Sequence, residues 1–147
     1  MKVEHAWSAL FEKAFREETS GQYAGVFIEG ITLAGAFPDP LPPNAAAHAS
    51  FSLVSAWYLP SKSDPIDPVA FHCRVGITLS DGRELDKQEF EGRAIPDQLT
   101  KTKVQFPVLP LAESGAMYFT VELKHEETWT AVARLPLFVK LLRRPPD

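Results

Sequence analysis

The sequence predicts an all-β protein built as a single antiparallel β-sandwich of about seven or eight strands. Apolar and polar residues alternate with a period of two across residues 69–79, as in a half-buried strand. Thirteen prolines and eight glycines divide the chain into segments of strand length. Hydrophobic residues make up 45% of the 147 positions and charged residues 23%, so the chain has enough apolar surface for one core.

The expected organisation is one domain over residues 1–147. It consists of an N-terminal segment (1–20), the β-sandwich (21–142) and an exposed tail (143–147). Within the first segment, the spacing of the apolar residues predicts a short amphipathic helix over residues 3–15. These residues are Val3, Trp7, Leu10, Phe11, Ala14 and Phe15.

Two strands are predicted in the first half of the sandwich. Residues 23–37 are rich in Val, Ile, Phe and Thr, and Gly25, Gly30 and Gly35 would each destabilise a helix by about 1 kcal/mol. The prolines at 38, 40, 42 and 43 remove backbone donors and end this strand. Residues 48–59 alternate at first and form the next strand, and residues 60–68 are turn formers that predict a loop.

The second half contains the most regular pattern of the chain. The alternating run at 69–79 leads into Asp81-Gly82, which is the turn chemistry of a hairpin, and the polar residues 83–92 form the returning strand. Further strands are predicted over residues 101–111, 114–123 and 129–142. Pro136 lies inside the last of these and predicts an edge position or a bulge.

The segment "GAFPDPLPPN" at residues 35–44 has two interpretations. Its polyproline character suits a peptide ligand, but it lacks the basic neighbour that commonly orients such peptides in a recognition groove. We favour the structural interpretation, in which the prolines end strands and block edge-to-edge pairing.

The order of these segments resembles a set of small uncharacterised bacterial proteins. The resemblance extends over almost the whole chain, from "MKVEHAW" and "ETSGQYAGVFIEGITLAG" through "FSLVSAWYL" and "FHCRVGITLSDGRE" to "SGAMYFTVEL" and "WTAVARLPLFV". It implies an immunoglobulin-like or C2-like β-sandwich in which residues 3–15 form a first strand, the alternative to the helix. It implies no established activity and no catalytic residues.

No catalytic constellation is present in the sequence. His5, His48, His72 and His125 lack the spacing that brings two imidazoles to one metal ion, and there is no G-x-S-x-G elbow or phosphate-binding glycine loop. Cys73 is the single cysteine and lies on the apolar face of its strand, so we expect a buried thiol. We therefore predict neither an enzyme nor a cofactor.

Asp64 and Asp67 in the 60–68 loop are the weak candidates for a metal site. Some C2-like sandwiches hold calcium with loop aspartates, although calcium needs 6–8 converging oxygen ligands. Asp-Pro pairs also arise as turn starters. A calcium-binding or small-ligand-binding sandwich that uses the 60–68 loop is thus the alternative function.

The net charge and hydropathy of the chain predict which partners it binds and in which compartment it resides. The formal net charge of −4 is dispersed and offers no basic face for nucleic acid. No run approaches the ~20 apolar residues of a membrane-spanning helix, and the N-terminus lacks the apolar core of a signal peptide. These features predict a cytoplasmic protein without membrane contact.

Exposed aromatic residues are the remaining candidates for function. Trp57 and Tyr58 precede a loop and Trp129 follows a turn, where aromatic side chains often anchor a partner. The competing interpretation, which we favour for each tryptophan, places it in the core between the sheets, because large aromatic side chains dominate cores. The leading hypothesis is a non-catalytic binding or assembly module that uses these residues to contact a protein partner, with a homo-oligomer as a further option.

Overall fold

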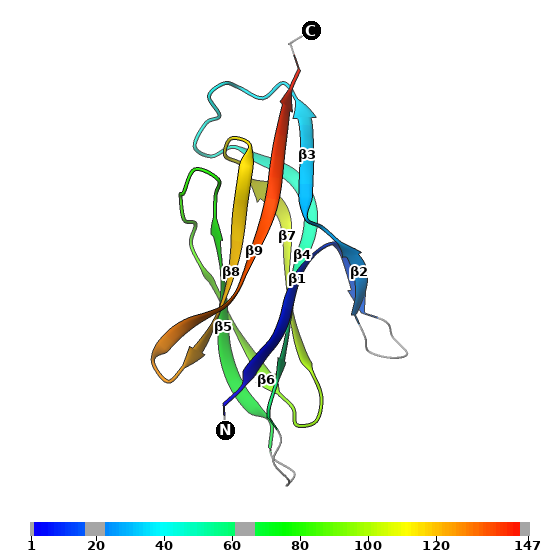
Figure 1. The fold of residues 1–147 in the computed structure, drawn as a ribbon, viewed down its shortest axis with the longest axis vertical. Coiled ribbons are helices and arrows are strands. Elements are labelled where there is room, and N and C mark those ends of the chain that lie inside the picture. Colours follow the sequence, from blue (N-terminus) through cyan, green and yellow to red (C-terminus); the bar gives the residue numbers. More distant parts are fainter. Residues whose placement is uncertain (1, 17–22, 61–66, 145–147) are drawn as a thin grey trace.

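The computed structural model describes residues 2–16, 23–60 and 67–144, and all regular structure within them is β-strand (Figure 1). The nine strands are β1 (Glu4–Arg16), β2 (Tyr23–Phe27), β3 (Gly30–Gly35), β4 (Ala46–Tyr58), β5 (Val69–Thr78), β6 (Gln88–Ala94), β7 (Thr100–Pro110), β8 (Gly115–His125) and β9 (Thr128–Arg143). The all-β prediction is confirmed. Among the described residues, none belongs to a helix that could cross a membrane.

Residues 4–16 of the N-terminal segment form a strand, as the resemblance implied, and the helical prediction for residues 3–15 is wrong. β1 pairs with β4 and, at its far end, with β2. Leu10 is buried against the core between the sheets, whereas the neighbouring Phe11 is buried on the opposite face of the strand against Phe27. Because both faces are covered here, apolar residues occur at consecutive positions and imitate helical spacing. A bulge between His5 and Trp7 shifts the register further.

The strands form two sheets. Sheet A has the order β2-β1-β4-β7, and sheet B has the order β3-β9-β8-β5-β6. All pairs are antiparallel except β3 and β9, which are parallel. The core lies between the sheets: Phe51 and Phe106 of sheet A stack at 5.0 Å, and Phe119 of sheet B packs edge-on against them at 5.6 and 5.5 Å.

The single strand expected over residues 23–37 is two strands in different sheets. Ile28 N donates to Leu10 O in sheet A at 3.0 Å, while the O of the next residue, Glu29, accepts from Phe138 N in sheet B at 3.0 Å. The chain therefore changes sheets between β2 and β3. This crossing brings β3 alongside β9 in the parallel sense.

The alternation across residues 69–79 is confirmed in β5. Phe71, Cys73 and Val75 are buried, whereas His72 is exposed. The Asp81-Gly82 turn also forms, with Gly82 at a φ of 91°, a conformation that glycine adopts at no steric cost. Local chain chemistry thus accounts for this hairpin.

The proline-rich segment connects β3 in sheet B to β4 in sheet A (Figure 1). Its carbonyl groups are bound by the protein itself: Arg143 Nη2 donates to Pro38 O at 3.0 Å, and Arg83 Nη1 donates to Pro43 O at 2.8 Å. Arg143 also pairs with Glu113 at 2.8 Å. Arg143 is therefore the last residue of β9 and anchors the segment between β3 and β4, although the sequence analysis assigned it to the exposed tail.

Pro136 lies at a sheet edge. β3 pairs with β9 only from Phe138 onward, so residues 128–137 of β9 have β8 as their strand partner among the described residues. Phe138 N points toward β3, and alternate residues of a strand point to the same side, so position 136 faces the open side. A proline at this position lacks a donor that would otherwise invite strand pairing.

Candidate functional site

Trp57 is a core residue, as the favoured interpretation of the tryptophans predicted, and its candidacy for a partner-binding surface is wrong. The side chain is fully buried, and its indole Nε1 donates to Thr102 Oγ1 at 3.0 Å. The ring packs against His5 of the same sheet and Phe71 of sheet B, with centroid separations of 5.2 Å each. The apolar surface of the ring is therefore buried and its one polar atom is hydrogen-bonded inside the protein. A partner cannot reach this side chain.

Tyr58 and Trp129 lie apart from Trp57 and from each other. Tyr58 follows Trp57 in β4 and points to the opposite face of sheet A, where its hydroxyl donates to Glu4 Oε2 at 2.7 Å. This hydrogen bond raises the pKa of the Tyr58 phenol. The ring of Trp129 is half-buried under Arg74, whose guanidinium carbon lies 4.3 Å from the ring centroid. The three predicted residues do not form one surface.

Arg74 is held in turn by Glu122 on the face of sheet B that points away from the core. The Glu122 carboxylate pairs with Arg74 and with Lys87, at 2.8 Å in both cases, and only 10% of the side chain is exposed. Burial favours the neutral carboxyl, but the two cations outweigh it and lower the pKa of Glu122. Trp129 thus lies beside an ion network in which Glu122 binds both Arg74 and Lys87.

The structure supplies no metal site in the part of the chain it describes. Asp64 lies outside the described residues, and Asp67 is exposed. Within residues 2–16, 23–60 and 67–144, no group of three His, Cys, Asp or Glu side chains could hold a metal ion. The calcium hypothesis for the 60–68 loop stays a prediction, because residues 61–66 of this loop lie outside the described residues.

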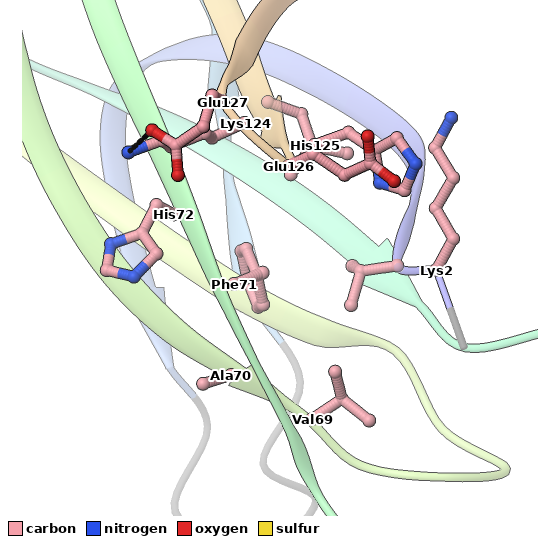
Figure 2. Close-up of a pocket in the computed structure, with 11 residues that line it drawn as sticks. Lys2, Val69, Ala70, Phe71, His72, Lys124, His125, Glu126 and Glu127 are labelled. Carbon is pink, nitrogen blue, oxygen red and sulfur yellow. Dashed lines mark ion pairs between the residues drawn. The ribbon is translucent and has the colours of Figure 1, made fainter.

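A polar groove of about 350 Å³ lies where the start of β1 approaches the β8–β9 turn (Figure 2). Figure 2 shows His125 and Glu126 close to Lys2, whereas His72 lies on the other side of Phe71. Lys124 pairs with Glu127 at 3.9 Å. The two histidines therefore do not converge on a common point, as a metal site or an acid–base pair would require.

His5 has the one histidine–hydroxyl contact found among the described residues. His5 Nε2 and Ser8 Oγ are 2.7 Å apart, and Ser8 Oγ is 2.7 Å from Ser55 Oγ. Burial lowers the pKa of His5, opposed by a backbone hydrogen bond to Trp7, so the imidazole stays neutral near pH 7. No carboxylate hydrogen-bonds this group in the described structure, and Ser55 is fully buried. We interpret the cluster as mutual satisfaction of buried polar atoms.

Among the described side chains, the largest exposed apolar ones lie elsewhere, on the side of the molecule where β1 and β9 of the two sheets meet. Phe27 is 68% exposed and stacks on Phe11 with a centroid separation of 4.8 Å. Phe138 is 60% exposed on the outer face of sheet B, opposite Gly30, which has no side chain to cover it. A groove of about 330 Å³ separates the two rings. We call its lining the Phe27–Phe138 surface: Ser8, Ala9, Leu10, Phe27, Ile28, Glu29, Leu135, Pro136 and Phe138.

This groove is open because two strand segments lack a partner on one side. Among the described residues, residues 4–9 of β1 pair only with β4, and residues 128–137 of β9 pair only with β8. A second groove of about 380 Å³ continues along the same line past Val3, His5 and Val132. Two grooves thus lie between β1 and β9, and the exposed phenylalanines line one of them.

Sequence reasoning missed both phenylalanines. For Phe138 a signal existed, because Leu137, Val139 and Leu141 alternate as buried residues and place Phe138 on the outer face. For Phe27 no such signal existed, since its exposure follows from the change of sheet immediately after it. Comparison of the chain with protein-family models found no matching family, and comparison with curated proteins found no matching sequence.

Proposed function

We propose that this protein is a non-catalytic binding module that contacts a protein partner through the Phe27–Phe138 surface. The observation that carries the proposal is the exposure of two phenylalanine rings, 68% and 60%, on either side of one groove. Burying such a side chain contributes about 1.5–3 kcal/mol relative to leaving it exposed. A partner that covers both rings recovers this free energy.

The composition of the groove supports a protein partner. Its walls are mainly apolar, with Leu10 and Ile28 on one side and Leu135 and Pro136 on the other, and Glu29 is its single charged residue. Interfaces between proteins place aromatic anchors at the centre and polar groups at the rim. This surface offers two aromatic anchors and one charged residue, and in our proposal it replaces the surface around Trp57, Tyr58 and Trp129.

The strand order supports an immunoglobulin-like type for the two-sheet fold. With β1, β4 and β7 taken as strands A, B and E, and β5, β6, β8 and β9 as C, C′, F and G, both sheets follow the immunoglobulin order. β2 and β3 are additions at one side, and strand D has no counterpart among the described residues. Folds of this type host many functions, so the proposal rests on the surface and not on the fold.

The test is affinity capture from the native cell lysate with the wild type and a Phe27→Ser/Phe138→Ser variant, read by mass spectrometry. A matched control is Val108→Ser, because Val108 is 41% exposed but lies on β7 at the other edge of sheet A. Circular dichroism establishes that all three proteins are folded. We expect a stoichiometric partner that binds the wild type and the control but not the double variant. Equal capture by all three proteins, or no partner at all, would overturn the proposal.

A further inference from the structure

The sheet edges of this protein are not equally protected against pairing with another strand. The side chains are described for three of the strands that end a sheet: β3, β6 and β7. Two of these strands, β6 and β7, carry the charges and prolines that natural proteins use to block edge pairing. β3 is the exception, because its six residues, Gly30–Gly35, include no charged residue and no proline. The blocking residues are Glu89, Glu91 and Arg93 on β6 and Lys101, Lys103, Pro107 and Pro110 on β7.

The backbone groups that β3 presents to its open side can be identified. Glu29 O accepts from Phe138 N, and Gly35 O accepts from Arg144 N at 2.9 Å, so these odd-numbered positions face β9. Successive residues of a strand direct their backbone groups to opposite sides, and therefore Gly30, Thr32 and Ala34 direct their N–H and C=O groups away from β9. No backbone partner for these groups lies among the described residues. Figure 1 shows β3 at the margin of the molecule.

We propose that a second copy of this chain pairs with the open edge of β3, antiparallel and about a twofold axis at Thr32. In this register Thr32 lies opposite Thr32 of the second copy, and Gly30 lies opposite Ala34. Every outward N–H and C=O group of Gly30, Thr32 and Ala34 is then paired, and both sheets B become one continuous sheet. The interface is isologous, the commonest form of protein dimer.

The side chains of β3 suit this register. Ile31 and Leu33 point inward and are half-buried against the core. In this register Ile31 lies opposite Leu33 of the second copy, and Leu33 lies opposite its Ile31. Their burial is completed by the second copy. The outer face brings together only Gly, Thr and Ala, so no like charges oppose each other.

Other registers are less favourable. A shift of the pairing by one residue would place inward residues opposite outward residues, which the pleat of a sheet forbids. A twofold axis at Leu33 keeps inward residues opposite inward residues. It leaves the outward N–H and C=O groups of Gly30 without a partner, because the opposite position lies beyond the end of β3 in the second copy. The register centred on Thr32 is therefore the one that satisfies the whole edge, and it uses no residue of the Phe27–Phe138 surface.

Analytical ultracentrifugation of the purified full chain tests the proposal. The wild type is expected at twice the monomer mass of 16.3 kDa. Thr32→Lys and Thr32→Glu, which each place like charges across the axis, are expected to be monomers separately and to form a heterodimer when mixed. The control Ala131→Lys adds the same charge at an exposed position of β9 and should remain dimeric.

Amide hydrogen exchange gives a second readout that is specific for this edge. In the wild type, the amides of Gly30, Thr32 and Ala34 should exchange slowly, and in Thr32→Lys those of Gly30 and Ala34 should exchange rapidly. A monomeric wild type, or a Thr32→Lys variant that dimerises like the wild type, would refute the proposal. A dimer lost only in Phe27→Ser/Phe138→Ser would place self-association on the Phe27–Phe138 surface instead and would also refute pairing through β3.

Discussion

Substitution of Gly92 by alanine should destabilise the protein because the ring of Phe71 occupies the space above this glycine. The two residues lie directly opposite each other in the β5–β6 pair. A methyl group at Gly92 would overlap Phe71 Cζ and lie 2.7 Å from Phe71 Cε1. The ring cannot move away freely, since it is buried and packs against Trp57 at 5.2 Å.

The magnitude follows from two opposing effects. Overpacking of a buried site costs about 1–3 kcal/mol, whereas alanine in place of glycine stabilises a compatible position by about 0.4–1 kcal/mol through the unfolded chain. The net loss in the free energy of unfolding should be about 1–2 kcal/mol. For a chain of this length the melting temperature should fall by about 2–8 °C.

Urea and thermal unfolding, followed by circular dichroism, measure this change. The matched comparison is Gly92→Ala in a Phe71→Leu background, where the smaller side chain relieves the overlap. The two substitutions should then be non-additive by at least about 0.5 kcal/mol. If Gly92→Ala leaves the melting temperature unchanged or raises it, the ring of Phe71 does not cover Gly92 and the reasoning is wrong.

Three further predictions follow from buried polar groups. Burial raises the pKa of the Cys73 thiol to about 11, despite a hydrogen bond to Thr102. A thiol reagent at pH 8 should therefore label Cys73 only as urea unfolds the protein. Labelling in native buffer would contradict this prediction. Thr102→Val leaves the Trp57 indole without its acceptor and should lower the free energy of unfolding by about 1–3 kcal/mol. Thr102→Ser keeps a hydroxyl acceptor and should recover most of this loss. Equal losses in the two variants would exclude the hydrogen bond as the cause. Burial lowers the pKa of His5 in the folded protein below the value of about 6.5 in the unfolded chain. The unfolded state therefore binds more protons, and stability should fall as the pH falls below about 6.5. His5→Gln should flatten this part of the profile; an unchanged slope in His5→Gln would assign the effect to other groups.

The proposed surfaces differ in how far the sequence pointed to them. The uncharged character of Gly30–Gly35 can be read from the sequence, and so can the outward phase of Phe138 against Leu137 and Val139. That Gly30–Gly35 is an edge strand cannot, because a strand's neighbours come from distant parts of the chain. Here β3 lies beside β9, more than a hundred residues later in the sequence.

The sequence by itself determined the features that depend on neighbouring residues. The alternation in β5, the Asp81-Gly82 turn and the connection through the prolines after Gly35 arise from local side-chain and backbone chemistry. Only the tertiary structure decided that Trp57 is buried and Phe27 exposed. It also decided that residues 3–15 form a strand, because pairing with β4 and packing on both faces override the helical spacing. The physical reason is that burial and strand pairing are contacts between segments far apart in the chain, which a local pattern does not specify.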